Sequence, residues 1–159
     1  MLPLIVIGVI VGLPVLLALI FQVNAVFVFM GIAAGYLLQM SLSGSVDLLA
    51  AMIIRGSDTM VIARIVLFTL PVVLTLLFLR KTAGKSLVFQ FIPLLFSGMM
   101  FGILMLSIMT QSFSESVYDS QYGGNIRSSA DLVTGIAVAS NIILAITLFK
   151  SQGGHKKHH

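Results

Sequence analysis

Charged residues are scarce in this chain: Asp, Glu, Lys and Arg make up 9% of its 159 residues, whereas 58% are hydrophobic. Soluble domains are about one quarter charged, so this sequence lacks the polar surface that keeps a domain dispersed in water. The mean hydropathy of +1.13 agrees with that exclusion. The composition therefore predicts an integral membrane protein, with the lipid bilayer as its first partner. The length allows one compact bundle, because each crossing uses about 20 residues.

Cysteine is absent, and all three histidines follow residue 154. Without cysteine the chain has no disulfides, thiolate metal sites or cysteine nucleophiles. No Asp, Glu or His lies deep within an apolar run, which leaves membrane hydrolysis and proton-coupled transport without their usual residues. We therefore expect a protein that is not an enzyme and that uses no cofactor or metal.

The net charge of +4 does not indicate nucleic-acid binding. That function needs basic residues gathered on a soluble face, whereas here they lie at the ends of apolar runs, where they orient a protein in the membrane.

Five apolar runs are bounded by polar residues, and backbone groups in lipid must bond internally, so these runs predict an all-α bundle of transmembrane helices. The five predicted spans cover residues 2–21, 25–40, 61–79, 87–110 and 132–149. They form a single domain over residues 1–150, followed by a disordered Gly/His/Lys tail over 151–159. In that tail the three histidines could alternatively bind a metal, or the lysines anionic lipid.

The first two runs are separated only by Gln22, Val23 and Asn24. This spacing predicts a tight helical hairpin with Asn24 as the N-cap of the second helix. The second run is short, so it could alternatively re-enter the membrane or lie in the interface. The start Met1-Leu2-Pro3 lacks the basic residues of a cleaved signal peptide, and we expect the first span to be retained.

The charges are distributed unevenly between the connections. Basic residues fill the link after the third span and the tail after the fifth, as Arg80, Lys81 and Lys85, and then Lys150, Lys156 and Lys157. The acids lie in or beside the other two connections, as Asp47, Asp58, Glu115, Asp119 and Asp131. Because Lys and Arg near span ends stay in the cytoplasm, this pattern predicts a cytoplasmic C-terminus and, after five crossings, an N-terminus outside.

Both outer connections carry helix signals. Ser45 can cap a short helix from Val46 to Arg55 with one apolar face, which predicts an amphipathic interfacial helix between spans two and three. In the second connection, Gly123 and Gly124 are expected to break any helix, and Asp131 to cap the fifth span.

Arg64 is the only charge clearly within a span. An ionisable group at such a position is a functional candidate by default. Its depth also lets the side chain snorkel to the outer interface, and we interpret it as an interface anchor.

Small residues four apart recur in the spans, and in lipid such pairs let helix backbones approach closely. The pairs are Gly8 with Gly12, Gly31 with Gly35, Gly98 with Gly102, and Gly135 with Ala139. They predict a tightly packed bundle, with one face left over for self-association or for binding other membrane proteins.

Three polar or kinking residues are candidates for a pathway through the bundle. Pro71 and Pro93 each remove a backbone donor within a span, which can frame a cavity or simply bend the helix. Asn141 lies near the middle of the fifth span. It could line a path or form an interhelical hydrogen bond.

The stretch from Gly31 to Thr110 resembles the CvpA-type (colicin V production protein) family. The resemblance rests on Gly31-Ile32-Ala33-Ala34-Gly35-Tyr36-Leu37-Leu38, on Ile62-Ala63-Arg64-Ile65-Val66-Leu67-Phe68, and on Gly98 and Gly102 of the fourth run. It implies a bacterial inner-membrane protein associated with toxin export and envelope maintenance, without a catalytic site. The chain departs from the family pattern in its fifth span and in lacking a basic residue beside the fourth-span glycines.

These observations lead to a primary and an alternative functional hypothesis. The first is a non-enzymatic scaffold or accessory subunit of a cell-envelope or secretion assembly. The alternative is a small oligomeric channel or carrier for an uncharged solute, with Asn141, Pro71 and Pro93 near its path.

Overall fold

The computed structural model describes residues 2–53, 57–82, 87–109 and 123–154, and the regular structure in these ranges is all helical. The helices are α1 (Leu2–Phe21), α2 (Ala25–Ile53), α3 (Ser57–Phe78), α4 (Leu87–Ile108) and α6 (Gly123–Gly154). Four of them hold a stretch long and apolar enough to cross a membrane, namely Ala25–Ser45, Met60–Phe78, Phe89–Ile108 and Ser128–Leu148. The corresponding stretch of α1, Ile5–Phe21, is shorter. The architecture is that of a helical, multi-pass membrane protein.

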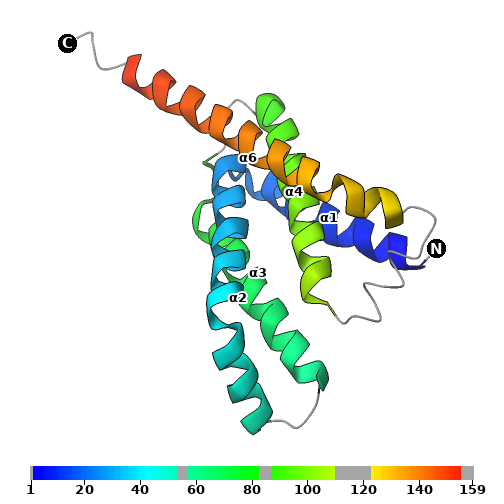
Figure 1. Ribbon diagram of the computed structural model, residues 1–159. Coiled ribbons are helices and arrows are strands. Elements are labelled where there is room, and N and C mark those ends of the chain that lie inside the picture. The colour runs from blue at the N-terminus through cyan, green and yellow to red at the C-terminus, as the bar shows by residue number, and fades with distance from the viewer. Residues whose placement is uncertain (1, 54–56, 83–86, 110–122, 155–159) are drawn as a thin grey trace.

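Helix α4 is the central element of the bundle. It packs against α1, α2 and α6, while α2 and α3 form the most extensive pair. In Figure 1, α2 and α3 run side by side, and the first and last helices, α1 and α6, cross α4. Half of the apolar stretch of α4 is buried, against one third or less in the other three long stretches. The side chains that α4 presents therefore decide how the helices are held together.

The turn between α1 and α2 is a Schellman motif closed by Gln22, which has a φ of 53°. The Val23 N–H donates to the Ala18 carbonyl at 2.9 Å and the Gln22 N–H to the Leu19 carbonyl at 3.2 Å, the two bonds that define this motif. The helix break at residues 22–24 is as predicted. The two helices make little contact beyond the turn, because α1 packs on α4 and α2 on α3. The predicted hairpin therefore opens instead of packing along its length.

The second helix is longer than predicted. Helix α2 continues without interruption through Ser41–Ser45 to Ile53, so the amphipathic segment is part of it and not a separate interfacial helix. Ser45 could act as a cap only if the helix stopped before it, and neither a proline nor a left-handed Gly44 stops it there. The apolar stretch Ala25–Ser45 is long enough to cross a membrane in full. Arg55 and Gly56, where the predicted short helix ends, lie outside the described residues.

The last helix also extends beyond its predicted bounds. Helix α6 starts at Gly123, where we expected a break, and runs through Asp131 as an interior residue and not as a cap. It continues to Gly154, so residues 151–154 of the predicted disordered tail are helical. The tail histidines lie outside the described residues.

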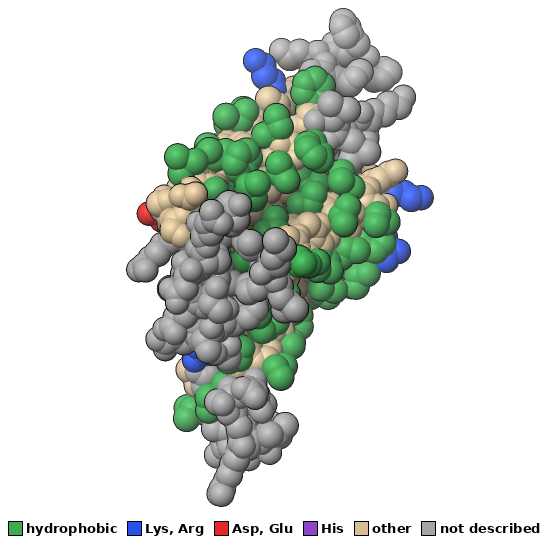
Figure 2. All heavy atoms as spheres, turned by 90° about the vertical axis from the view of Figure 1, so that its right-hand side faces the viewer, with side chains coloured by type: hydrophobic (Ala, Val, Ile, Leu, Met, Phe, Trp, Pro, Cys, Tyr) green, Lys and Arg blue, Asp and Glu red, His purple; other side chains and the backbone are tan. Residues whose placement is uncertain are grey.

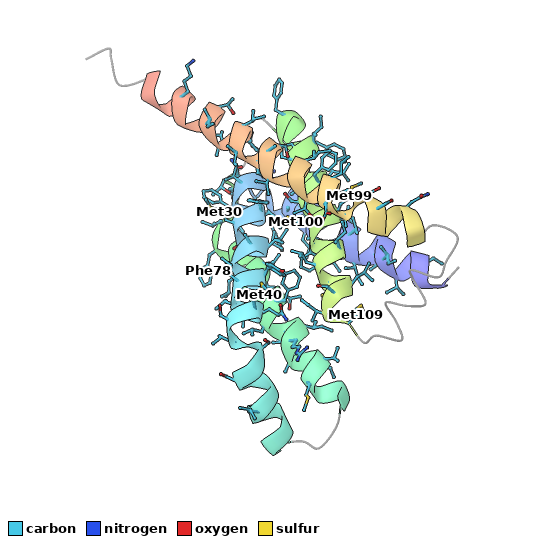
Figure 3. The ribbon with its side chains drawn as sticks, viewed as in Figure 1. Met30, Met40, Phe78, Met99, Met100 and Met109 are labelled. Atoms are coloured by element: carbon cyan, nitrogen blue, oxygen red, sulfur yellow. The ribbon has the colours of Figure 1, made fainter. Side chains whose placement is uncertain are left out.

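Apolar side chains make up most of the interior and also much of the surface. Phe68 of α3 and Phe101 of α4 stack with their ring centroids 5.0 Å apart. Phe78, near the end of α3, lies at the outer surface in Figure 3 and is 80% exposed. Figure 2 shows hydrophobic side chains spread over much of the described surface, with Lys and Arg at its edges. Such a surface is suited to lipid and not to water.

Candidate functional site

Four polar side chains are buried in the described part of the chain: Asn24, Gln90, Ser97 and Asn141. Gln90 and Ser97 lie on one face of α4, because their separation is close to two helical turns. Asn24 stands before α2, and Asn141 belongs to α6. We call these four residues the polar seam, since they follow the central helix from its first turn inwards.

At one end, the polar seam caps the start of α2. The Asn24 side chain accepts a hydrogen bond from the Val26 N–H at 3.0 Å, which makes Asn24 the N-cap that the sequence predicts. The Gln90 side-chain oxygen accepts from the Ala25 N–H at 3.2 Å. The Thr82 hydroxyl accepts from the Asn24 N–H at 3.1 Å. Three backbone N–H groups at the start of α2 have no acceptor within the helix and donate to side chains instead. Two of these side chains, Gln90 and Thr82, come from distant segments.

At the inner end, the seam joins α6 to α4. The Asn141 side-chain nitrogen donates to the Ser97 hydroxyl at 2.9 Å and to the Ala137 carbonyl of its own helix at 2.8 Å. The Ser97 hydroxyl donates in turn to the Pro93 carbonyl at 2.8 Å. Asn141 therefore makes an interhelical hydrogen bond, the commoner of the two uses considered for such a residue.

The side-chain oxygen of Asn141 is buried and has no hydrogen-bond partner among the described residues. Exchanging the amide nitrogen and oxygen would place an oxygen against the Ala137 carbonyl, so the neighbouring groups fix this orientation. A buried acceptor without a donor costs about 1–3 kcal/mol. The seam thus offers one neutral acceptor between α4 and α6, while its amides and hydroxyl carry no charge and do not ionise near neutral pH.

The two candidate pathway prolines lie in different parts of the bundle. The Pro93 carbonyl is 3.5 Å from the Asn141 side-chain nitrogen, at the seam. Pro71 lies instead where α3 meets α2, and its carbonyl accepts from the Thr75 hydroxyl at 2.7 Å. A Cβ added at Gly31 would meet this same carbonyl at 3.4 Å. Pro71 is therefore part of a helix contact and does not join Asn141.

The four small-residue pairs fall into two groups. Gly31 and Gly35 face α3, and Gly98 and Gly102 face α1, at distances that would not accept an added Cβ without movement. The other two pairs are open. Among the described residues, nothing lies within 4 Å of a Cβ added at Gly8, Gly12 or Gly135, and Ala139 is exposed. Half of the predicted packing pairs thus serve the fold of this chain, and half face outwards.

Two grooves lie on the outside of the bundle, away from the polar seam. One, of about 300 Å³, lies between α1, α4 and α6, with Asn125 and Ser129 as its polar side chains. The other, of about 510 Å³, runs along the outer face of α1 over Gly8 and Gly12. Neither groove is lined by a residue of the seam.

The remaining candidate, Arg64, is half-buried within α3. Within the described ranges, no three His, Asp or Glu side chains lie close enough together to hold a metal ion.

Gln90, Ser97 and Thr82 are not among the site residues predicted from the sequence. A glutamine in the first turn of an apolar helix was the available signal, since such a side chain must find a partner near the end of the bundle. Comparison of the chain with protein-family models, curated proteins and solved structures finds no match.

Proposed function

We propose that this chain is a non-enzymatic, multi-pass membrane protein that binds other membrane helices, as a scaffold or accessory subunit of a cell-envelope or secretion assembly. We further propose that it resides in a bacterial inner membrane with its C-terminus in the cytoplasm and its N-terminus outside. The resemblance to the CvpA-type family and the distribution of charge support this placement.

The observation that carries the proposal is the outward position of Gly8 and Gly12 on α1. They form the floor of a groove whose rims are exposed apolar side chains such as Val9 and Leu16. Small residues on a lipid-facing helix let a second backbone approach closely. In lipid the hydrophobic effect does not drive helices together, so this close packing contributes much of the association energy. Inside this chain the same kind of pair, Gly98 with Gly102, receives α1.

The channel or carrier alternative receives less support. It needs a hydrated path past Asn141, but Asn141 is 2% exposed and neither described groove reaches it. Its unpartnered oxygen is the one observation in favour of that alternative. Substituting Asn141 with Leu separates the two, because solute flux into vesicles changes only if the residue lines a path.

Affinity isolation in mild detergent tests the association role. The variant carries Gly8→Leu and Gly12→Leu, and Gly44→Leu serves as the matched control, because an added Cβ at Gly44 also meets nothing within 4 Å. We expect the double variant to recover at least about tenfold less of a differently tagged second copy, or of the copurifying membrane proteins, since a loss of 1.4 kcal/mol has that effect. The control should match the wild type. Equal recovery by all three proteins would contradict the proposal.

A further inference from the structure

Two segments that are far apart in the sequence, residues 21–24 and 79–82, are joined by hydrogen bonds at one end of the bundle. The Lys81 N–H donates to the Phe21 carbonyl at the end of α1, at 3.0 Å. The Thr82 hydroxyl donates to the Leu79 carbonyl at 2.7 Å and accepts from the Asn24 N–H at 3.1 Å. The segment that leaves α3 is therefore held against the turn between α1 and α2.

The same contact positions two adjacent cationic residues. The Arg80 guanidinium lies over the Phe21 ring, 4.5 Å from its centroid. A cation–π contact of this kind uses the charge of the guanidinium and none of its N–H donors. Lys81 has a φ of 62°, a conformation uncommon for a lysine, and its backbone N–H is engaged by Phe21. The backbone and one side chain of this pair are thus ordered before any ligand binds.

Arg80 and Lys81 are both exposed, and no described carboxylate forms an ion pair with either. They lie two and three residues after Phe78, where the apolar stretch of α3 ends, which places them at the depth of lipid headgroups if α3 spans the bilayer. Arginine beside lysine matches the charge and donor geometry that a phosphate diester requires.

We propose that Arg80 and Lys81, ordered by Phe21, form a binding site for the phosphate of an anionic phospholipid headgroup. The site depends on the membrane location of the chain but not on the proposed association through α1. Failure of one proposal therefore leaves the other standing.

Native mass spectrometry of the purified full-length protein, with equal amounts of phosphatidylglycerol and phosphatidylcholine, tests the site. The wild type should retain phosphatidylglycerol preferentially. Lys150→Gln removes one charge from an exposed position on α6 and should lower the preference by about fivefold at most, the effect of any basic residue near an anionic surface. Arg80→Gln and Lys81→Gln should each lower it more than Lys150→Gln does, because they also remove a donor held in place for the phosphate. Equal losses in all three variants would overturn the proposal, because charge alone would then explain the binding.

The aromatic ring provides a second test, in which no charge changes. Phe21→Leu should lower the preference for phosphatidylglycerol, and Phe21→Tyr should keep it, because only the leucine removes the ring under Arg80. Circular dichroism of both variants checks that they keep their helices. An unchanged preference in Phe21→Leu would show that the site is not built as proposed. Inorganic phosphate, added at the concentration of the lipid, should not displace bound phosphatidylglycerol, and displacement would point to a free anion as the ligand.

Discussion

Replacement of Gly35 by alanine tests whether close backbone contact holds α2 against α3. A Cβ at this position would overlap the Phe68 carbonyl oxygen and lie 3.2 Å from the carbonyl carbon. These atoms belong to the backbone of α3, so a side-chain rotation cannot relieve the contact. The two helices must move apart, and the stacked pair of Phe68 and Phe101 moves with them.

The size of the effect follows from two opposing terms. Overpacking a close contact costs about 1–3 kcal/mol. Alanine in place of glycine within a helix returns up to about 1 kcal/mol through helix propensity. Gly12→Ala is the matched control, because an added Cβ there meets nothing within 4 Å and only the propensity term remains. The difference between the two variants isolates the overpacking cost of about 1–3 kcal/mol.

Unfolding in mixed micelles with increasing mole fraction of dodecyl sulfate, followed by circular dichroism, measures both variants. Gly35→Ala should unfold earlier than the wild type, and Gly12→Ala at the same point or later. Gly31→Ala should lie between them, because its nearest neighbour is the Thr75 hydroxyl, 2.7 Å away, on a side chain that can rotate. A Gly35→Ala protein as stable as Gly12→Ala would refute the close approach of α2 and α3.

Three further predictions concern the polar seam and the topology. A double-mutant cycle of Asn141→Leu and Ser97→Ala should give a coupling energy of about 0.6–1.7 kcal/mol in the same unfolding assay, which is the range for interhelical hydrogen bonds in membranes. A coupling energy near zero would mean that these two side chains form no hydrogen bond. Gln90→Leu should lower the free energy of unfolding by about 1–3 kcal/mol, because the Ala25 N–H loses its acceptor. An unchanged free energy of unfolding would mean that this N–H has another partner. The chain has no cysteine, so single cysteines can report the topology. Asp131→Cys should react with an impermeant thiol reagent added outside intact cells, and Lys150→Cys should not. The reverse labelling pattern would show that the orientation is opposite to the one proposed.

The ends of the helices could be predicted where a local signal coincided with a real stop. Asn24 is such a case: it follows a polar interruption, and its side chain caps α2 as its residue type predicts. Ser45 and Asp131 carry the same signal but lie within α2 and α6. Extending an existing helix adds one hydrogen bond per residue, whereas a new helix needs a costly nucleus. Without a proline or a left-handed residue to end the first helix, a cap residue stays in its interior.

The use of the glycine pairs could not be predicted from their spacing. Gly31 with Gly35 and Gly8 with Gly12 look alike in sequence, but within the described ranges only the first pair meets another helix. The pattern reports that a backbone can be approached, while the partner depends on the packing of all the helices. The polar seam is likewise a product of assembly, because Gln90 and Ala25 are brought together by the fold and not by sequence proximity.

The hydrogen bonds between residues 80–82 and the turn at residues 22–24 allow the side of the membrane to be inferred for that turn, which has no charge of its own. Lys81 is bonded to Phe21, and Gln90 to Ala25, so the turn at residues 22–24 lies at the same end of the bundle as residues 80–82. If the basic residues keep residues 80–82 in the cytoplasm, they keep the uncharged turn there too. Helix α2 then crosses from the cytoplasm to the outside and α3 crosses back. Helices α4 and α6 do the same, so that Lys150 lies in the cytoplasm. The side of the N-terminus therefore depends on α1 alone, whose described apolar stretch is shorter than the other four.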